Sequence, residues 1–304
     1  ARLHILHVLR PAGHKPLRDW FQPSPDADLK VAQARATLRH LLIELTAAFD
    51  LTVSVEVIVG DTIGSLMRAS DQVELVLLGR PADRRFAGLL PDGTVNRMIR
   101  RCRRPVLVVK AAAQDRYRTV LVPVDFKAPS DAAMHFAGRM RLGAGLHVFH
   151  AIDSRREAVL RDADVPEHVI RVTRLMEEGA INARMRRRVA GLGLDSNSMS
   201  YALAYGSPAR ATLTHARGLG ADLIVAGRRS GSVLGRFLHR SVSSHVLSRA
   251  CCDMLIVPGS LDCSPPMATE AGTPQVLQQP LTSAHLVDDA VLIRSGTAHA
   301  EAGA

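Results

Sequence analysis

A pattern of alternating strand-like and helix-like segments occurs twice in this chain, and this repetition constrains the fold more than any other feature. The segment LHILH (3–7) is echoed by LHVFH (146–150), 143 residues later. VELVLLGR (73–80) is echoed by ADLIVAGR (221–228), 148 residues later. A repeat of this length is a compact folding unit and not the short period of a solenoid. The sequence therefore predicts two copies of one α/β unit.

Apolar periodicity divides each copy into short strands and longer helices. The strands are nearly continuous runs of Val, Ile and Leu, which is typical of parallel sheets covered on both faces. Strands are expected at 3–10, 51–60, 73–79, 105–110, 118–125, 145–153, 198–205, 221–227 and 253–258. Helices are expected at 26–50, 62–71, 94–102, 128–143, 166–190, 207–217 and 241–250. This alternation predicts an α/β fold of two tandem, doubly wound, mostly parallel sheets of the five-stranded type, with helices on both faces.

The first copy is incomplete. The second copy begins with a strand, RTVLVPVD, and a helix that have no counterpart before Ala1. In a doubly wound sheet this strand is central, so its absence would leave two neighbouring strands with costly unpaired backbone groups. Either residues upstream of Ala1 supply the strand or another segment fills its place, and we expect the former.

Three regions follow from these patterns. The first repeat is expected at 1–112, the second at 116–259, and a tail at 260–304. The tail is rich in Pro, Ser, Thr and Gly and shows little periodicity, so we expect it to be disordered. Within it, LVDDAVLIR (286–294) is a short apolar island for which docking at an unspecified place is the alternative.

The basic composition limits the class of partner less than the net charge of +10 suggests. Of the 39 basic residues, 35 are Arg, a skew that coding bias would also produce. Arginines with helical spacing at 97–104 and the run at 186–188 make nucleic-acid binding an alternative. Solvated helix surfaces are the simpler interpretation. Aromatic residues make up only 4% of the chain, which argues against a platform for stacking bases.

The sequence predicts a cytoplasmic protein without membrane association. No apolar run approaches the roughly 20 residues of a membrane helix, and the chain does not open like a signal peptide. The cysteines lack metal-ligand spacing and are expected to be reduced thiols. They stand at Cys102, Cys251, Cys252 and Cys263. No metal site is predicted.

The second repeat resembles the universal stress protein family. The resemblance rests on VLVPVDFKAPSDAAMHFAGRMR, AGLHVFHAID, YGSPARATLTHARGLGADLIVAGRRSG and RSVSSHVLSRACCDMLIVP, in the family's order between residues 118 and 258. Residues 1–110 match a repeat of the same kind that lacks its first strand and helix. The resemblance implies a tandem universal stress protein with the adenine-nucleotide alpha-hydrolase-like fold.

Some members of that family bind ATP in a cleft at the carboxyl ends of the strands, and others do not. The resemblance implies that Asp125, at the end of its strand, would contact the adenine side of the nucleotide. The family's G-x-x-G-x9-G-[S/T] loop corresponds to GRRSGSVLGRFLHRS (227–241), with Gly227 as the first glycine and Ser241 as the final hydroxyl. A turn-capping role for Asp125 and a helix N-cap role for Ser241 are the ordinary structural alternatives.

Two positions of this loop depart from the family pattern. Ser230 and Arg240 stand where the family has glycines, which permit positive φ and let backbone N–H groups approach phosphate closely. An arginine strains a left-handed backbone, but its charge can also contact phosphate from the side. Gly231 gives the loop some freedom if its register shifts. The corresponding loop of the first repeat, 79–94, has Ala82 for the second glycine, and we expect no nucleotide there.

The resemblance therefore implies a stress-response sensing and interaction module that is not an enzyme, with at most slow incidental ATP hydrolysis. Weak ATP binding would be confined to the second repeat and would need no metal beyond any that the nucleotide carries. The alternative is a dimerisation and protein-interaction scaffold with a degenerate site. Pairing through the final strands, 106–109 and 255–257, within one chain or between two chains, is expected, as are unidentified protein partners.

Overall fold

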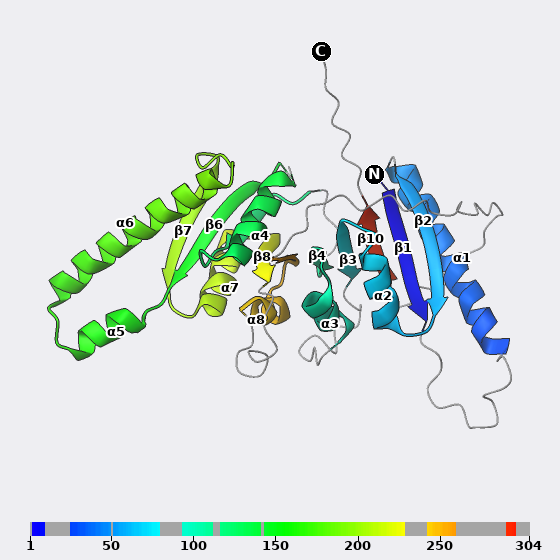
Figure 1. Cartoon of the computed structure of the whole chain (residues 1–304), viewed down its shortest axis with the longest axis horizontal. Coiled ribbons are helices and arrows are strands. Elements are labelled where there is room, and N and C mark those ends of the chain that lie inside the picture. Colours follow the sequence, from blue (N-terminus) through cyan, green and yellow to red (C-terminus); the bar gives the residue numbers. More distant parts are fainter. Residues whose placement is uncertain are drawn as a thin grey trace, which may run out of the picture. The chain divides into compact units, whose positions relative to one another are not determined.

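The structure is a computed structural model of the whole chain. It describes residues 2–9, 25–49, 51–79, 93–111, 116–140, 143–228, 242–259 and 290–295. The chain divides into two compact units (Figure 1). Unit 1 comprises Ala1–Leu107 and Asp262–Ala304, and unit 2 comprises Val108–Leu261.

Unit 2 is a parallel sheet with the strand order β9-β8-β5-β6-β7. Its strands are β5 (Thr119–Pro123), β6 (Gly145–Ile152), β7 (Met199–Tyr205), β8 (Leu223–Arg228) and β9 (Asp253–Pro258). Its helices are α4 (Ala128–Arg139), α5 (Arg155–Asp162), α6 (Glu167–Gly191), α7 (Pro208–Leu219) and α8 (Val242–Arg249). The predicted doubly wound α/β fold is confirmed for the second repeat.

Helices cover the sheet of unit 2 on both faces. The chain moves outward from β5 to β7 and then returns to β8 and β9, so right-handed crossovers place the two sets of helices on opposite faces. Helix α4 packs against β8 and β9, and α6 runs alongside β7 (Figure 1). All six residues of β9 are buried, and Leu223, Ile224 and Val225 of β8 are fully enclosed. Burial on both faces explains why these strands read as continuous aliphatic runs.

Two aspartates fasten the amino ends of the strands in unit 2. Asp222, just before β8, accepts hydrogen bonds from the backbone N–H groups of Arg118 and Thr119, at 2.6 and 3.1 Å. Asp253, buried at the start of β9, accepts a hydrogen bond of 2.7 Å from the hydroxyl of Tyr117. Such charge-assisted bonds are stronger than neutral ones. The segment that leads into β5 is thereby held against β8 and β9.

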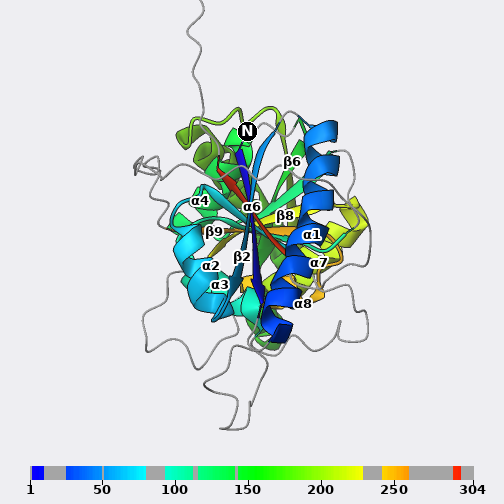
Figure 2. The same ribbon diagram turned by 90° about the vertical axis from the view of Figure 1, so that its right-hand side faces the viewer.

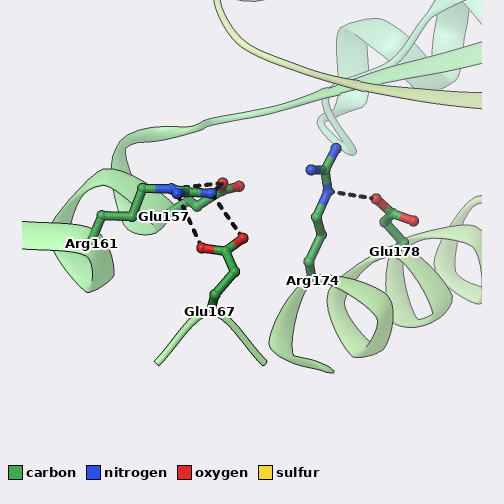
Figure 3. Close-up of polar contacts among 5 residues, drawn as sticks. All are labelled: Glu157, Arg161, Glu167, Arg174 and Glu178. Carbon is green, nitrogen blue, oxygen red and sulfur yellow. Dashed lines mark hydrogen bonds and ion pairs between the residues drawn. The ribbon is translucent and has the colours of Figure 1, made fainter. Parts of the chain in front are cut away.

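Helix α5 was not predicted from the sequence. Its residues, RREAVLRD, are mostly polar and lack an apolar period, so no amphipathic pattern marks them. Arg161 instead pairs with Glu157 one turn earlier, at 3.0 Å, and with Glu167 at the start of α6, at 3.2 Å (Figure 3). Exposed pairs of this kind contribute little to stability because solvent screens them, but they connect α5 to the start of α6.

Unit 1 repeats the architecture with a different central strand. Its strands are β1 (Arg2–Leu9), β2 (Thr52–Val59), β3 (Leu75–Gly79), β4 (Val106–Val109) and β10 (Ala290–Ser295), and the boundary between the two units falls within β4. Its helices are α1 (Pro25–Ala48), α2 (Thr62–Ser70) and α3 (Thr94–Arg101). The order of the strands is β2-β1-β10-β3-β4. Helix α1 covers one face of this sheet, while α2 and α3 cover the other (Figure 2).

Strand β10 corrects the expectation for the tail. Residues 290–295 were expected to be disordered with the rest of 260–304, but they form a strand between β1 and β3. The strand is antiparallel to both neighbours, with Ile293 opposite His4 on one side and Val76 on the other. The apolar island thus gives hydrogen-bonding partners to two buried strand edges. The central position of unit 1 is filled by another segment of the chain, the alternative that the sequence analysis ranked second.

Replacing Tyr117 by Phe is expected to lower the free energy of unfolding by about 1 kcal/mol at neutral pH, because Asp253 loses a hydrogen bond. Burial, followed by the hydrogen bond and charge of Asp253, raises the pKa of Tyr117. The native state therefore holds the phenol proton more tightly than the unfolded chain does. The wild-type advantage is complete below the unfolded pKa of about 10 and declines as the pH rises above it. Urea unfolding of both proteins from pH 7 to 11 measures this difference, and an advantage that grows above pH 10 would contradict the assignment.

Candidate functional site

The candidate site lies where the strand order of unit 2 reverses. Strand β5 pairs with β6 on one side and with β8 on the other. In open α/β sheets, ligands bind outside the carboxyl ends of the strands at such a switch point. Asp125 follows β5 by two residues, and Gly227 is the penultimate residue of β8, so the fold brings these two predicted residues to neighbouring strand ends. The other predicted site residues, Ser230, Gly231, Arg240 and Ser241, lie outside the described residues.

Asp125 organises the turn between β5 and α4. Its exposed carboxylate accepts a hydrogen bond from the backbone N–H of Lys127, at 3.2 Å. Its own N–H donates to the hydroxyl of Ser130, at 3.3 Å, and that buried hydroxyl donates to the carbonyl of Lys127, at 2.9 Å. This is the turn-capping role that the sequence left open beside a ligand role. Contact between Asp125 and a nucleotide stays a prediction.

Gly227 is required by the packing of α4 against β8. A β-carbon at this position would lie 2.0 Å from the carbonyl oxygen of Pro129 and 2.9 Å from the backbone nitrogen of Ser130. Real atoms do not approach so closely, and both contacts are to backbone that cannot turn aside. The first turn of α4 therefore sits directly on Gly227. This glycine has a structural function whether or not phosphate binds beside it.

Ser243 is a residue of this site that sequence reasoning missed. Its hydroxyl donates a hydrogen bond to the carbonyl of Gly227, at 3.0 Å, from the first turn of α8. Residues 227 and 243 bracket the predicted phosphate loop. The bond therefore holds together the strand end where the loop leaves and the helix where it returns. The signal in the sequence was the serine-rich start of that helix, RSVSS, of which only Ser241 was singled out.

A stack of three side chains lies beside Asp125, and it too was missed. Phe126 has a left-handed backbone, with φ +59°, and its ring lies 4.7 Å from the ring of His150. The guanidinium of Arg184, from α6, lies 4.2 Å from the centre of the Phe126 ring. His150 is held in turn, since its Nδ1 donates to the carbonyl of Val124 at 2.8 Å. Because Phe126 directly follows Asp125 in the chain, the stack adjoins the turn between β5 and α4.

The arginines of α6 are largely engaged inside unit 2. Three guanidinium groups lie over aromatic rings at 4.1 to 4.5 Å, and a fourth pairs with a carboxylate of α4. These contacts are Arg174 over Tyr205, Arg184 over Phe126, Arg186 over Tyr201, and Arg188 with Asp131. Arg174 also pairs with Glu178 at 3.2 Å (Figure 3). These four side chains thus stabilise the packing of α6 within unit 2, and a guanidinium that lies over an aromatic ring keeps its positive charge.

Unit 1 does not build the same site. Its central strand, β10, runs in the opposite direction to β1 and β3, so it begins at the edge of the sheet where β3 ends. No residue can therefore follow a central strand at that edge as Asp125 does in unit 2. Gly79 ends β3, and Gly93 caps α3 with an ordinary φ of −71°, while Ala82 lies outside the described residues. The absence of nucleotide binding by the first repeat stays a prediction.

The described residues lack two further features, a metal-binding cluster and a membrane-spanning helix. Within the ranges given above, no group of three or more His, Cys, Asp or Glu side chains is arranged to hold a metal ion. Of the helices in those ranges, none has the length and apolar character needed to cross a bilayer.

Comparison with known sequences decides the family. The profile of the universal stress protein family matches the chain twice, over residues 1–110 and 116–258. The chain belongs to the universal stress protein family. The double match also confirms the predicted tandem arrangement. Universal stress protein YxiE of Bacillus subtilis is 32% identical over 154 residues, which cover 46% of this chain and 99% of that protein.

Solved universal stress protein structures share the fold over most of the chain. A universal stress protein from Archaeoglobus fulgidus matches with a TM-score of 0.62 and 19% identity, over 84% of this chain and 85% of its own. A Pseudomonas aeruginosa protein described as functionally unknown matches with a TM-score of 0.50 and 18% identity, over 83% of this chain and 92% of its own. At these identities the similarity establishes the fold alone.

Replacing Gly227 by Ala is expected to destabilise the protein by about 3 kcal/mol in the absence of any ligand, because the new methyl group overlaps the backbone of α4. The matched control is Gly179→Ala in α6, where a β-carbon meets nothing within 4 Å. That change should stabilise the helix by about 0.5–1 kcal/mol. Chemical denaturation measures both effects. Unchanged stability of Gly227→Ala would mean that the glycine serves only a ligand.

Proposed function

We propose that this universal stress protein is a stress-response module whose unit 2 binds an adenine nucleotide, weakly, at the carboxyl ends of β5 and β8. The observation that carries the proposal is the meeting of Asp125 and Gly227 at the switch point of the sheet. These are the two positions of the family's nucleotide pattern that fall within the described residues.

The side chains around this point suit an adenine nucleotide. The exposed carboxylate of Asp125 can accept a hydrogen bond from the exocyclic amine of adenine. The guanidinium of Arg184 supplies positive charge beside it, which favours an anionic ligand. On the other side, α8 begins next to Gly227, and the amino end of a helix favours phosphate. The predicted phosphate loop, 227–241, runs between these two points in the sequence.

Nucleotide binding would act as a signal in this proposal. A ligand that binds only the folded state stabilises it in proportion to the logarithm of its concentration. Bound nucleotide would therefore stabilise the β8–α8 connection and alter the surface that unit 2 offers to partner proteins. A cytoplasmic location, and pairing of repeats or chains through 106–109 and 255–257, remain predictions that belong with this function.

A second candidate function is a protein-interaction scaffold that binds no nucleotide. The observation in its favour is that Asp125 and Gly227 each have a sufficient structural role, in the turn and in the packing of α4. Ser230 and Arg240 also depart from the family's loop glycines. The two candidates differ in whether nucleotide affects the isolated protein.

Calorimetric titration with ATP is expected to give a dissociation constant of about 10⁻⁴ M for the wild-type chain, and no measurable binding for Asp125→Ala. The matched control is Asp195→Ala. Asp195 is also exposed and also accepts a bond from the backbone N–H two residues on, Asn197, at 2.9 Å, but it precedes β7 at the opposite edge of the sheet. The Asp195→Ala variant should bind ATP with the same affinity as the wild type. Absence of binding by the wild type at about 1 mM ATP would favour the scaffold.

A second pair of variants tests the charge beside the site. Arg184→Gln is expected to weaken ATP binding about three- to tenfold, and less so at high salt, because a nearby cation is lost. Arg186→Gln removes an equivalent guanidinium from the same helix, at 4.5 Å from the ring of Tyr201 near the amino end of β7. The affinity of the Arg186→Gln variant for ATP should stay within about twofold of the wild-type affinity. Equal effects of the two substitutions would show that only the overall charge matters.

A further inference from the structure

Unit 1 receives its central strand from a distant part of the chain. Strand β10 pairs with β1 and β3 of unit 1, although it follows unit 2 in the sequence. In unit 2 the same position is held by β5, which is contiguous with that unit and parallel to both neighbours. In unit 1 it is held by β10, which is antiparallel to both neighbours. The central position of this fold thus accepts strands of either direction.

The two strands that flank β10 are buried and need a partner. Ile5 and Leu6 of β1 and Val76 of β3 have no exposed surface, and Leu78 is 2% exposed. The outer edge of β1 is paired with β2, while Val76 of β3 donates its N–H to the carbonyl of Pro105, at 3.0 Å. Within the described residues of unit 1, only β10 pairs with the two inner edges. Unpaired backbone groups at this depth would be costly, so an open slot strongly favours the docking of a strand.

Recognition in this slot rests on the backbone. Six residues of β10 are in register with β1, from Arg2 opposite Ser295 to His7 opposite Ala290. Four residues are in register with β3, from Leu75 opposite Arg294 to Leu78 opposite Val291. When a strand is added to a sheet, main-chain hydrogen bonds of this kind supply the affinity. Strand β10 of a second molecule can form the same backbone hydrogen bonds with β1 and β3, because its sequence is identical in every copy.

We propose that the slot between β1 and β3 is a strand-binding site that also accepts β10 from a second copy of the chain, giving a strand-exchanged dimer. Exchange of an identical element is a low-cost route to dimers, since it needs no new complementary surface. Residues 259–289 separate β9 from β10, and a chain of that length spans at most about 100 Å, enough to reach another molecule. Because β10 is tethered to its own chain, docking within that chain is favoured when the protein concentration is low. Docking between chains competes as the protein concentration approaches the effective concentration of the tethered strand, typically of millimolar order.

Ile293→Pro tests whether β10 holds the slot. Ile293 is opposite His4 and Val76, so a proline there removes an N–H from the middle of the ladder and blocks pairing. Thr297→Pro, two residues beyond the strand, is the control. In Ile293→Pro, amides of 2–9 and 75–79 are expected to exchange with solvent at least about a hundredfold faster than in the wild type, and Thr297→Pro should match the wild type. A peptide of residues 286–297 should restore protection, and the same peptide with the proline should not.

Mixing two isotopically distinguishable preparations tests exchange between chains. After incubation at about 0.5 mM and brief warming, native mass spectrometry should find mixed dimers for the wild type and Thr297→Pro, and few for Ile293→Pro. Mixed dimers that persist in Ile293→Pro would overturn the proposal, because they would form through another surface, and so would an absence of mixed dimers in the wild type.

If Ile293→Pro does not fold, hydrogen exchange in the wild type decides whether β10 holds the slot. The free energy of opening measured by exchange at the amides of 290–295 should equal that of the amides of β1 and β3. Exchange of 290–295 at the rate of a free peptide would overturn the proposal. Neither test involves nucleotide, so both outcomes are independent of nucleotide binding by unit 2. Mixed dimers in Ile293→Pro would favour pairing of chains through 106–109 and 255–257 in place of strand exchange.

Discussion

Backbone pairing at the centre of each sheet is the interaction on which the rest of this molecule depends. In unit 2, β5 pairs with β6 and β8, and all three strands end at the same edge, where Asp125 and Gly227 meet. In unit 1, β10 supplies the same pairing from the opposite direction. The two sheets have equivalent strand orders but differ in the residues at the edge where the parallel strands end. The two units therefore differ in the direction of the central strand, and with it in which residues follow that strand.

Much of the fold could be predicted because its signals are local. Strands buried on both faces, such as β8 and β9, read as aliphatic runs, and the recurrence of LHILH as LHVFH marks the duplication. Helix α5 and strand β10 escaped prediction for different reasons. Helix α5 is held by ion pairs around Arg161, which carry no hydrophobic period. The position of β10 depends on a pairing almost 300 residues apart, and an apolar hexamer does not specify its partner strand.

The candidate site was predictable in outline and not in its contacts. The order of motifs located Asp125 and Gly227 at strand ends, because sequence order along β5 and β8 translates directly into position. The stack of Phe126, His150 and Arg184 could not be predicted, since it joins a turn, a strand and the far part of a helix. Nor could the sequence reveal that several arginines of α6 lie on aromatic rings.

The close contact between Gly227 and the first turn of α4 has a consequence for how motifs in this family are interpreted. Only glycine fits beneath the carbonyl of Pro129, so natural selection for a folded protein would retain it even in a lineage that had abandoned nucleotides altogether. The first glycine of the loop is therefore a marker of architecture. The presence of this glycine in a related chain is therefore not by itself evidence of nucleotide binding.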